Sequence, residues 1–136
     1  MTLNDDHAAA AAITHAFFAG LDHNEPDAVA ACMAAEGVWM RQGTPLIGPD
    51  AVRAACAARP KDRATAHVIT NLSVRTDGPD RLKVRFYLLA YLSAREAGAW
   101  TAPTLAPLRE CEDTLIRTAG GLRILHKDSR QLMPPA

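Results

Sequence analysis

The sequence predicts an α+β fold in which helices cover one face of a curved sheet. Its first part carries apolar residues at helical spacing, at Ala9, Ala12, Ile13, Ala16 and Phe17. From residue 65 onward, four long segments alternate in polarity as strands do, with turns between them. Strands of this length curve. We therefore expect the helices to close over the concave face of an antiparallel or mixed sheet, leaving a cone-shaped cavity between the layers.

Caps and turns predict where the elements begin and end. Asp5 or Asp6 is suited to begin the first helix, and Gly20 to end it. Asp27 is suited to cap the second helix, and Pro49 stands in the first turn of the third. The expected helices span residues 5–20, 28–35 and 49–58. The expected strands span residues 38–41, 65–76, 81–95, 108–118 and 122–132, and the last four form an antiparallel meander.

Length and charge restrict the class of protein. The 136 residues fit a single domain, residues 1–136. Basic and acidic residues number 15 each, so the formal net charge is zero and no nucleic-acid partner is expected. No apolar stretch is long enough to span a membrane, and the acidic N-terminus is a poor signal peptide. The three cysteines lack metal-like spacing, so we expect free thiols in a reducing cytoplasm.

His67 is the conspicuous polar residue of the first long strand. It stands near the start of residues 65–74, a stretch otherwise poor in charge. A histidine on a half-buried strand is either a satisfied packing residue or a proton-transfer group that faces a cavity. The pattern of residues leaves both interpretations open.

Two tyrosines share one face of the second long strand. If the face of Tyr87 and Tyr91 is concave, their hydroxyls can bind a carbonyl or stabilise an oxyanion. They can equally be core rings with a polar tip in water, or face a partner subunit. Because both faces of this strand are apolar, we expect the sheet to be covered on both sides, which predicts a homodimer through the convex face.

Other candidate residues have two interpretations each. Trp39 is part of the cavity wall or a packing residue, and Arg41 reaches a substrate acid or pairs with a carboxylate. Asp113 points inward or joins cross-strand ion pairs. His126 and Asp128 share a face of the last strand, but two ligands are insufficient for a metal site. We predict no metal and no cofactor.

Short motifs spread over most of the chain carry a family resemblance. They are Leu21-Asp22, Trp39, residues 46–52, Thr65-Ala66-His67 with Asn71, Asp113 with Arg117, and residues 120–124. In this order they resemble the nuclear transport factor 2-like (NTF2-like) superfamily, and its SnoaL-like branch in particular. That branch is similar to scytalone dehydratase and to the small subunits of ring-hydroxylating dioxygenases. The resemblance implies an NTF2-like cone with three N-terminal helices packed on the sheet.

The resemblance also implies a site. In the dehydratase-like pattern an aspartate after the first helix orients a histidine on the first long strand, and Asp22 and His67 hold these positions. A carboxylate that accepts the Nδ1–H of an imidazole fixes its tautomer and raises its basicity. The implied function is a cofactor-independent lyase or isomerase that acts on a small hydrophobic, cyclic molecule. The implied pocket residues are Phe17, Trp39, Arg41, Tyr87, Tyr91, Asp113 and His126.

Two departures from the pattern keep other functions open. The strand after His67 has no second histidine, which the dehydratase pattern has, and Leu122 stands where an aromatic residue is usual. The fold also hosts proteins that are not enzymes. The alternatives are therefore a non-catalytic binding or assembly subunit, like the dioxygenase small subunits, and a pocket that has lost its activity.

Overall fold

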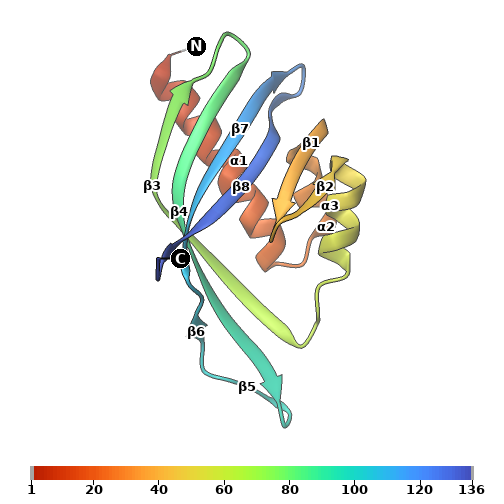
Figure 1. Cartoon of the computed structure of the whole chain (residues 1–136). Coiled ribbons are helices and arrows are strands. Elements are labelled where there is room, and N and C mark those ends of the chain that lie inside the picture. The colour runs from red at the N-terminus through yellow and green to blue at the C-terminus, as the bar shows by residue number, and fades with distance from the viewer. Residues whose placement is uncertain (1, 136) are drawn as a thin grey trace.

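A curved mixed sheet and one long helix form the two main layers of the fold (Figure 1). The computed structural model describes residues 2–135. The helices are α1 (Leu3–Asp22), α2 (Pro26–Ala31) and α3 (Gly48–Ala57). The strands are β1 (Met33–Arg41), β2 (Thr44–Ile47), β3 (Arg63–Thr76), β4 (Arg81–Glu96), β5 (Ala99–Trp100), β6 (Thr104–Leu105), β7 (Leu108–Thr118) and β8 (Gly121–Met133).

The four long strands form the predicted meander. The sheet order is β2-β1-β8-β7-β4-β3, and the pairs β3–β4, β4–β7 and β7–β8 are antiparallel. The sheet is mixed because β1 pairs parallel with β8. The short strands β5 and β6 pair with β4. The α+β class and the curved mixed sheet are thus as predicted.

The prediction of three N-terminal helices packed on the sheet needs correction. The 20-residue α1 crosses behind the sheet and contacts β3 and β8 (Figure 1). The 6-residue α2 packs on α1 and α3, while α3 follows two strands and packs on α2 and β1. Residues 33–35, predicted as helix, lie in β1 instead, because Met33 and Ala34 are buried and Met33 pairs with Ile124 of β8. Tertiary pairing here outweighs the helical pattern of the sequence.

The ends of α1 also differ from the prediction. Thr2 is the N-cap and forms a capping box with Asp5, so Asp5 is the third residue of the helix rather than its cap. Asp6 is buried and accepts hydrogen bonds from Arg117. The helix continues beyond Gly20, where an added Cβ would lie 2.6 Å from a Val29 side-chain carbon. Gly20 therefore permits close packing of α1 on α2 rather than ending the helix.

The hydrophobic core lies between α1 and the concave face of the sheet. Its largest fully buried side chains include Phe17 of α1, Phe86 of β4 and Leu115 of β7. The three cysteines are buried free thiols. Within residues 2–135, no helix has the length and apolar character needed to cross a membrane.

Candidate functional site

A cavity of about 330 Å³ opens between the end of α1, β1, α3 and the concave face of the sheet. Its apolar wall includes Phe18, Trp39, Leu88 and Ala90. Its complete lining is Phe18, Leu21, Trp39, Met40, Arg41, Gln42, Ala55, Cys56, Arg59, Thr65, His67, Leu88, Ala90, Leu92, Ala106, Arg109, Cys111, Lys127, Asp128 and Ser129. An apolar wall with a few converging polar groups is typical of a small-molecule site.

The last residue of α1 holds the histidine of β3. His67 Nδ1 lies 2.6 Å from Asp22 Oδ1, and the His67 backbone N–H donates to Asp22 Oδ2 over 2.8 Å. One carboxylate thus fixes both the backbone and the ring of His67. The Phe18 ring packs beside the imidazole, with 5.0 Å between the ring centroids. Because Nδ1 is engaged by Asp22, Nε2 is the ring nitrogen left for a ligand.

Two further side chains support this carboxylate. Thr65, two residues before His67 on the same strand face, donates its hydroxyl to Asp22 Oδ1 over 3.0 Å. Arg59 donates to Thr65 Oγ1 over 3.0 Å and to the backbone carbonyl of Leu21 over 2.6 Å. The hydrogen bonds therefore run in one direction, from Arg59 through Thr65 to Asp22, and the carboxylate is the final acceptor.

The protonation state of Asp22 decides the tautomer of His67. Burial raises the pKa of Asp22, but hydrogen bonds from the His67 ring and backbone, the His67 charge and the Thr65 hydroxyl outweigh burial, so the pKa lies below its usual value of 3.8. Near neutral pH Asp22 is therefore ionised and only accepts hydrogen bonds. The proton between the two side chains belongs to His67 Nδ1, which leaves a lone pair on Nε2 in the neutral ring.

The lowered pKa of Asp22 predicts a pH dependence of stability. A carboxyl with a lowered folded-state pKa stabilises the fold above its unfolded-state pKa, and this contribution is lost as pH falls through the folded-state pKa. We expect Asp22→Asn to lower the free energy of unfolding by roughly 1.5–3 kcal/mol at pH 7. The difference from wild type should shrink below about pH 3.8. Urea unfolding monitored by circular dichroism at several pH values measures this difference in the free energy of unfolding.

A matched control for this prediction is Asp27→Asn. Asp27 is 92% exposed and pairs with Arg53 on the surface. Loss of that pair should cost less than about 1 kcal/mol. An Asp22→Asn difference that persisted unchanged at acidic pH would contradict the linkage to the Asp22 carboxylate.

A second buried ion pair lies at the floor of the cavity. Lys127 Nζ donates to Asp113 Oδ2 over 2.8 Å, and both side chains are almost completely buried. The ammonium also lies 4.6, 4.5 and 5.2 Å from the ring centroids of Phe17, Phe18 and Phe86. Burial raises the pKa of Asp113, although the Lys127 charge opposes the shift. Lys127 lines the cavity and Asp113 lies behind it.

The structure brings four of the predicted site residues together. His67 and Asp22 are hydrogen bonded, and Trp39 and Arg41 line the same cavity. Arg41 stacks over the Trp39 ring at 5.6 Å. Phe17 is fully buried behind this wall, with its ring edge-on to Trp39 at 5.1 Å, so it supports the cavity without lining it.

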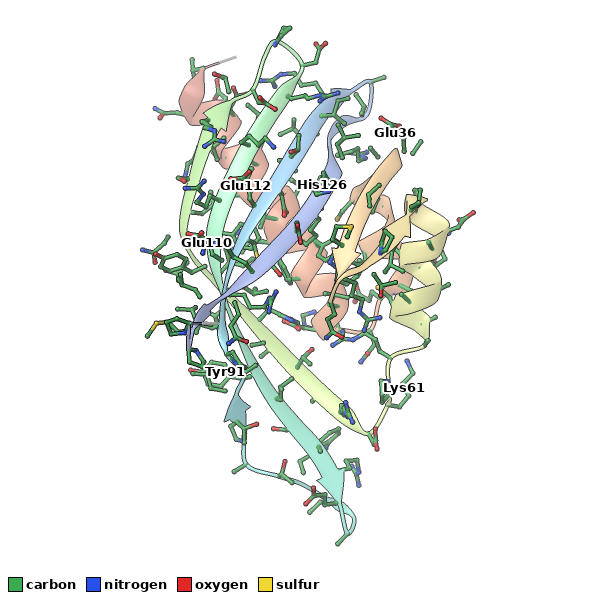
Figure 2. The ribbon with its side chains drawn as sticks, viewed as in Figure 1. Glu36, Lys61, Tyr91, Glu110, Glu112 and His126 are labelled. Carbon is green, nitrogen blue, oxygen red and sulfur yellow. The ribbon has the colours of Figure 1, made fainter. Side chains whose placement is uncertain are left out.

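The other predicted pocket residues lie elsewhere. Leu88 and Ala90 of β4 line the cavity, so strand alternation places Tyr87 and Tyr91 on the outer face. Asp113 pairs with Lys127 rather than with Arg117, which pairs with Asp6. His126, labelled in Figure 2, is exposed on β8 and does not line the cavity. Within residues 2–135, no three His, Cys, Asp or Glu side chains are grouped as metal ligands.

Sequence reasoning missed six polar residues of the site: Gln42, Arg59, Thr65, Arg109, Lys127 and Ser129. Thr65 could have been predicted as a site residue, because residues two apart on a strand share a face and His67 was already a candidate. Cross-strand ion pairing was one interpretation of Asp113, and its partner is Lys127, whose burial no local pattern indicates. Arg59 reaches the cavity from the segment that follows α3, and Arg109 reaches it from β7. No local pattern indicates either placement.

The fold and the site define a small α+β cavity protein in which a carboxylate holds a histidine against an apolar wall. Comparison with known families gives the more specific assignment: the chain belongs to the SnoaL-like domain family, which residues 3–128 match. No curated protein matches the chain.

Three solved structures illustrate the shared fold. A proposed aromatic ring hydroxylase from Novosphingobium aromaticivorans is 20% identical, with a TM-score of 0.83 over 98% of this chain and 94% of the other. A proposed scytalone dehydratase from the same organism is 17% identical, with a TM-score of 0.81 and coverages of 94% and 85%. ActVI-ORFA from Streptomyces coelicolor is 15% identical, with a TM-score of 0.76 and coverages of 91% and 95%. An NTF2-like protein from Novosphingobium aromaticivorans shares this fold as well, with 17% identity, a TM-score of 0.81 and coverages of 98% and 86%, so the expected NTF2-like fold is confirmed.

Proposed function

We propose that this protein binds a small hydrophobic, cyclic molecule and acts on it as a cofactor-independent lyase or isomerase. The observation that carries the proposal is the 2.6 Å contact of His67 Nδ1 with Asp22 at the wall of an apolar cavity. His67 is the general acid/base, and Asp22 is its positioning residue. Membership of the SnoaL-like family supports a small-molecule ligand.

The proposed chemistry is proton transfer by one imidazole. Nε2 removes a proton from an acidic carbon of the bound molecule, and Asp22 stabilises the imidazolium that forms. An isomerase returns the proton to another carbon, whereas a lyase gives it to a departing hydroxyl group. The apolar wall replaces part of the water around the reacting atoms, so electrostatic interactions there are stronger than in bulk water.

Hydrogen exchange of a neutral bicyclic ketone tests the proposal without knowledge of the natural substrate. In D₂O, the protein should accelerate loss of the C1 proton signal of 2-tetralone in proton NMR spectra. His67→Ala should reduce this acceleration by about 10²-fold or more, because the general base is lost. His15→Ala is the matched control, since exposed His15 also has its Nδ1 on an oxygen, the Ala11 carbonyl. Equal rates in wild type and His67→Ala would overturn the assignment.

We also propose that a second copy of the chain covers the outer face of the sheet. Val68 and Tyr91 of this face are 42% and 41% exposed, and Leu105, which pairs with Tyr91, is 55% exposed. Val68 lies opposite Leu89 across β3 and β4, so the apolar side chains form a continuous patch. Light scattering after size exclusion should give twice the mass of one chain.

A charge in this patch should separate the subunits. Val68→Lys should give a monomer, because an unpaired charge would be buried in the interface. Ile47→Lys, at a residue 67% exposed on β2, should remain dimeric. A monomeric wild type would contradict the proposed dimer.

A further inference from the structure

Arginine side chains surround the cavity. Arg41, Arg59 and Arg109 line it, and each residue is half-buried. Within residues 2–135, no carboxylate lies at ion-pair distance from any of the three. Arg53 and Arg130, which lie outside the cavity, do pair with carboxylates. Three cationic groups therefore face the ligand space without an anionic partner from the protein.

The partners of these guanidinium groups are neutral. Arg109 donates from Nε to Ser129 Oγ over 2.8 Å and from Nη2 to the Ser129 carbonyl over 3.0 Å. Arg41 stacks on Trp39. Arg59 donates a hydrogen bond to the Thr65 hydroxyl, which in turn donates to Asp22. Neutral oxygens and a ring orient a guanidinium without cancelling its charge, so Arg41 and Arg109 keep donors for a ligand.

The positive charge extends over two walls of the cavity. Burial raises the pKa of the Cys56 thiol on α3, and the charges of Arg59 and Arg41 oppose this rise. Burial raises the pKa of Cys111 on β7 to about 12. The charges of Lys127 and Arg109 oppose this rise, and those of Asp113 and Asp128 add to it. The Lys127 charge is balanced by Asp113. The lining carboxylate, Asp128, is exposed and accepts a hydrogen bond from the Ser129 backbone.

We infer that the ligand is a small cyclic or aromatic carboxylic acid, bound as its anion through Arg109 and Arg41. This inference rests on the proposed function and specifies its substrate class. Guanidinium groups bind carboxylates through charge-assisted, often bidentate hydrogen bonds, and a half-buried site strengthens them. The apolar body of the ligand lies against Trp39, Leu88 and Ala90. Anchoring one end of the ligand limits which of its carbons approaches His67 Nε2.

A pair of probes of nearly the same shape, one anionic and one neutral, tests the inference. 2-Naphthoate and its neutral amide, 2-naphthamide, are titrated into ¹⁵N-labelled protein, and the indole N–H signals of the two tryptophans are followed. Trp39 lines the cavity, whereas Trp100 lies on β5 and serves as the internal control. We expect naphthoate to shift the Trp39 signal with an affinity at least about tenfold higher than that of naphthamide.

Arginine variants locate the charge. Arg109→Gln and Arg41→Gln should each weaken naphthoate binding by about tenfold and leave naphthamide binding unchanged. Arg53→Gln, on the surface of α3, should change neither affinity. The inference would be overturned if the two probes bound wild type with equal affinity. It would also be overturned if neither Arg41→Gln nor Arg109→Gln changed the affinity for naphthoate.

The two proposals fail in different ways. If the ligand class is wrong, exchange of neutral 2-tetralone still depends on His67 while the probe pair shows no charge preference. If the catalytic proposal is wrong, that exchange does not respond to His67→Ala, although naphthoate remains the preferred probe. If neither naphthalene probe shifts the Trp39 signal, the inference is overturned as well.

Discussion

Replacing Asp22 by Asn should abolish most of the activity while leaving the cavity in place. The amide is nearly the same size as the carboxylate but carries no charge, so it loses the stabilisation of the imidazolium. Its NH₂ group can donate to His67 Nδ1, which favours the tautomer with the proton on Nε2. Nε2 would then have no lone pair for the substrate proton. We expect 2-tetralone exchange to fall by about 10²-fold or more.

Two measurements separate this effect from simple loss of structure. Long-range ¹H–¹⁵N NMR spectra of the His67 ring report which nitrogen carries the proton, and the assignment should move from Nδ1 to Nε2 in Asp22→Asn. Thr65→Val removes one hydrogen bond to Asp22 and keeps the charge. In Thr65→Val the His67 ring should keep its proton on Nδ1, and the exchange rate should fall less than in Asp22→Asn. An Asp22→Asn variant with wild-type exchange would contradict the positioning role.

The long strands could be predicted because their period-two patterns are local. The parallel pairing of β1 with β8 could not, since it joins Met33 to Ile124 across most of the chain. Residues 33–35 are rich in alanine, which favours helix, and only the contact with β8 makes them strand. The end of the second predicted helix was therefore wrong for a non-local reason.

The Asp22–His67 contact, 45 residues apart in sequence, was reached through resemblance rather than pattern. The facing of the tyrosines was undetermined because both faces of β4 are apolar. The register resolves it: His67 lies opposite Ala90, so the inner row of β4 carries Ala90 and the tyrosines occupy the outer row. Arg109 was missed because a single arginine at the start of a strand resembles any exposed charge.

Replacing Lys127 by Met should produce the largest loss of stability of any single change considered. Methionine keeps the length of the side chain among the Phe17, Phe18 and Phe86 rings but removes the ammonium. Asp113 would then be a buried carboxyl without its partner, and its Oδ1 already has no hydrogen-bond partner among the described residues. Breaking a buried pair on one side costs about 3–5 kcal/mol. That is a large part of a typical stability of about 5–15 kcal/mol.

The pH dependence distinguishes this mechanism from a packing defect. The pKa of Asp113 is already raised by burial, and loss of the opposing Lys127 charge raises it further. A group with a raised folded-state pKa stabilises the fold below its unfolded-state pKa, and the contribution is lost as pH rises through the folded-state pKa. The deficit of Lys127→Met should therefore be greatest at neutral pH and shrink on acidification. A packing defect would show no such recovery.

A double substitution completes the test. Asp113→Asn combined with Lys127→Met removes both charges. The double variant should therefore be more stable at pH 7 than Lys127→Met alone, and the coupling energy between the two substitutions should be about 1–3 kcal/mol. Lys83→Met is the control, because Lys83 makes only a 3.8 Å surface contact with Glu112 and should cost less than about 1 kcal/mol. Denaturant unfolding of wild type, Asp113→Asn, Lys127→Met, the double variant and Lys83→Met at pH 5 and pH 7 measures these differences. Additive effects at neutral pH would mean that the ammonium does not compensate the carboxylate, and that the aromatic rings alone account for its burial.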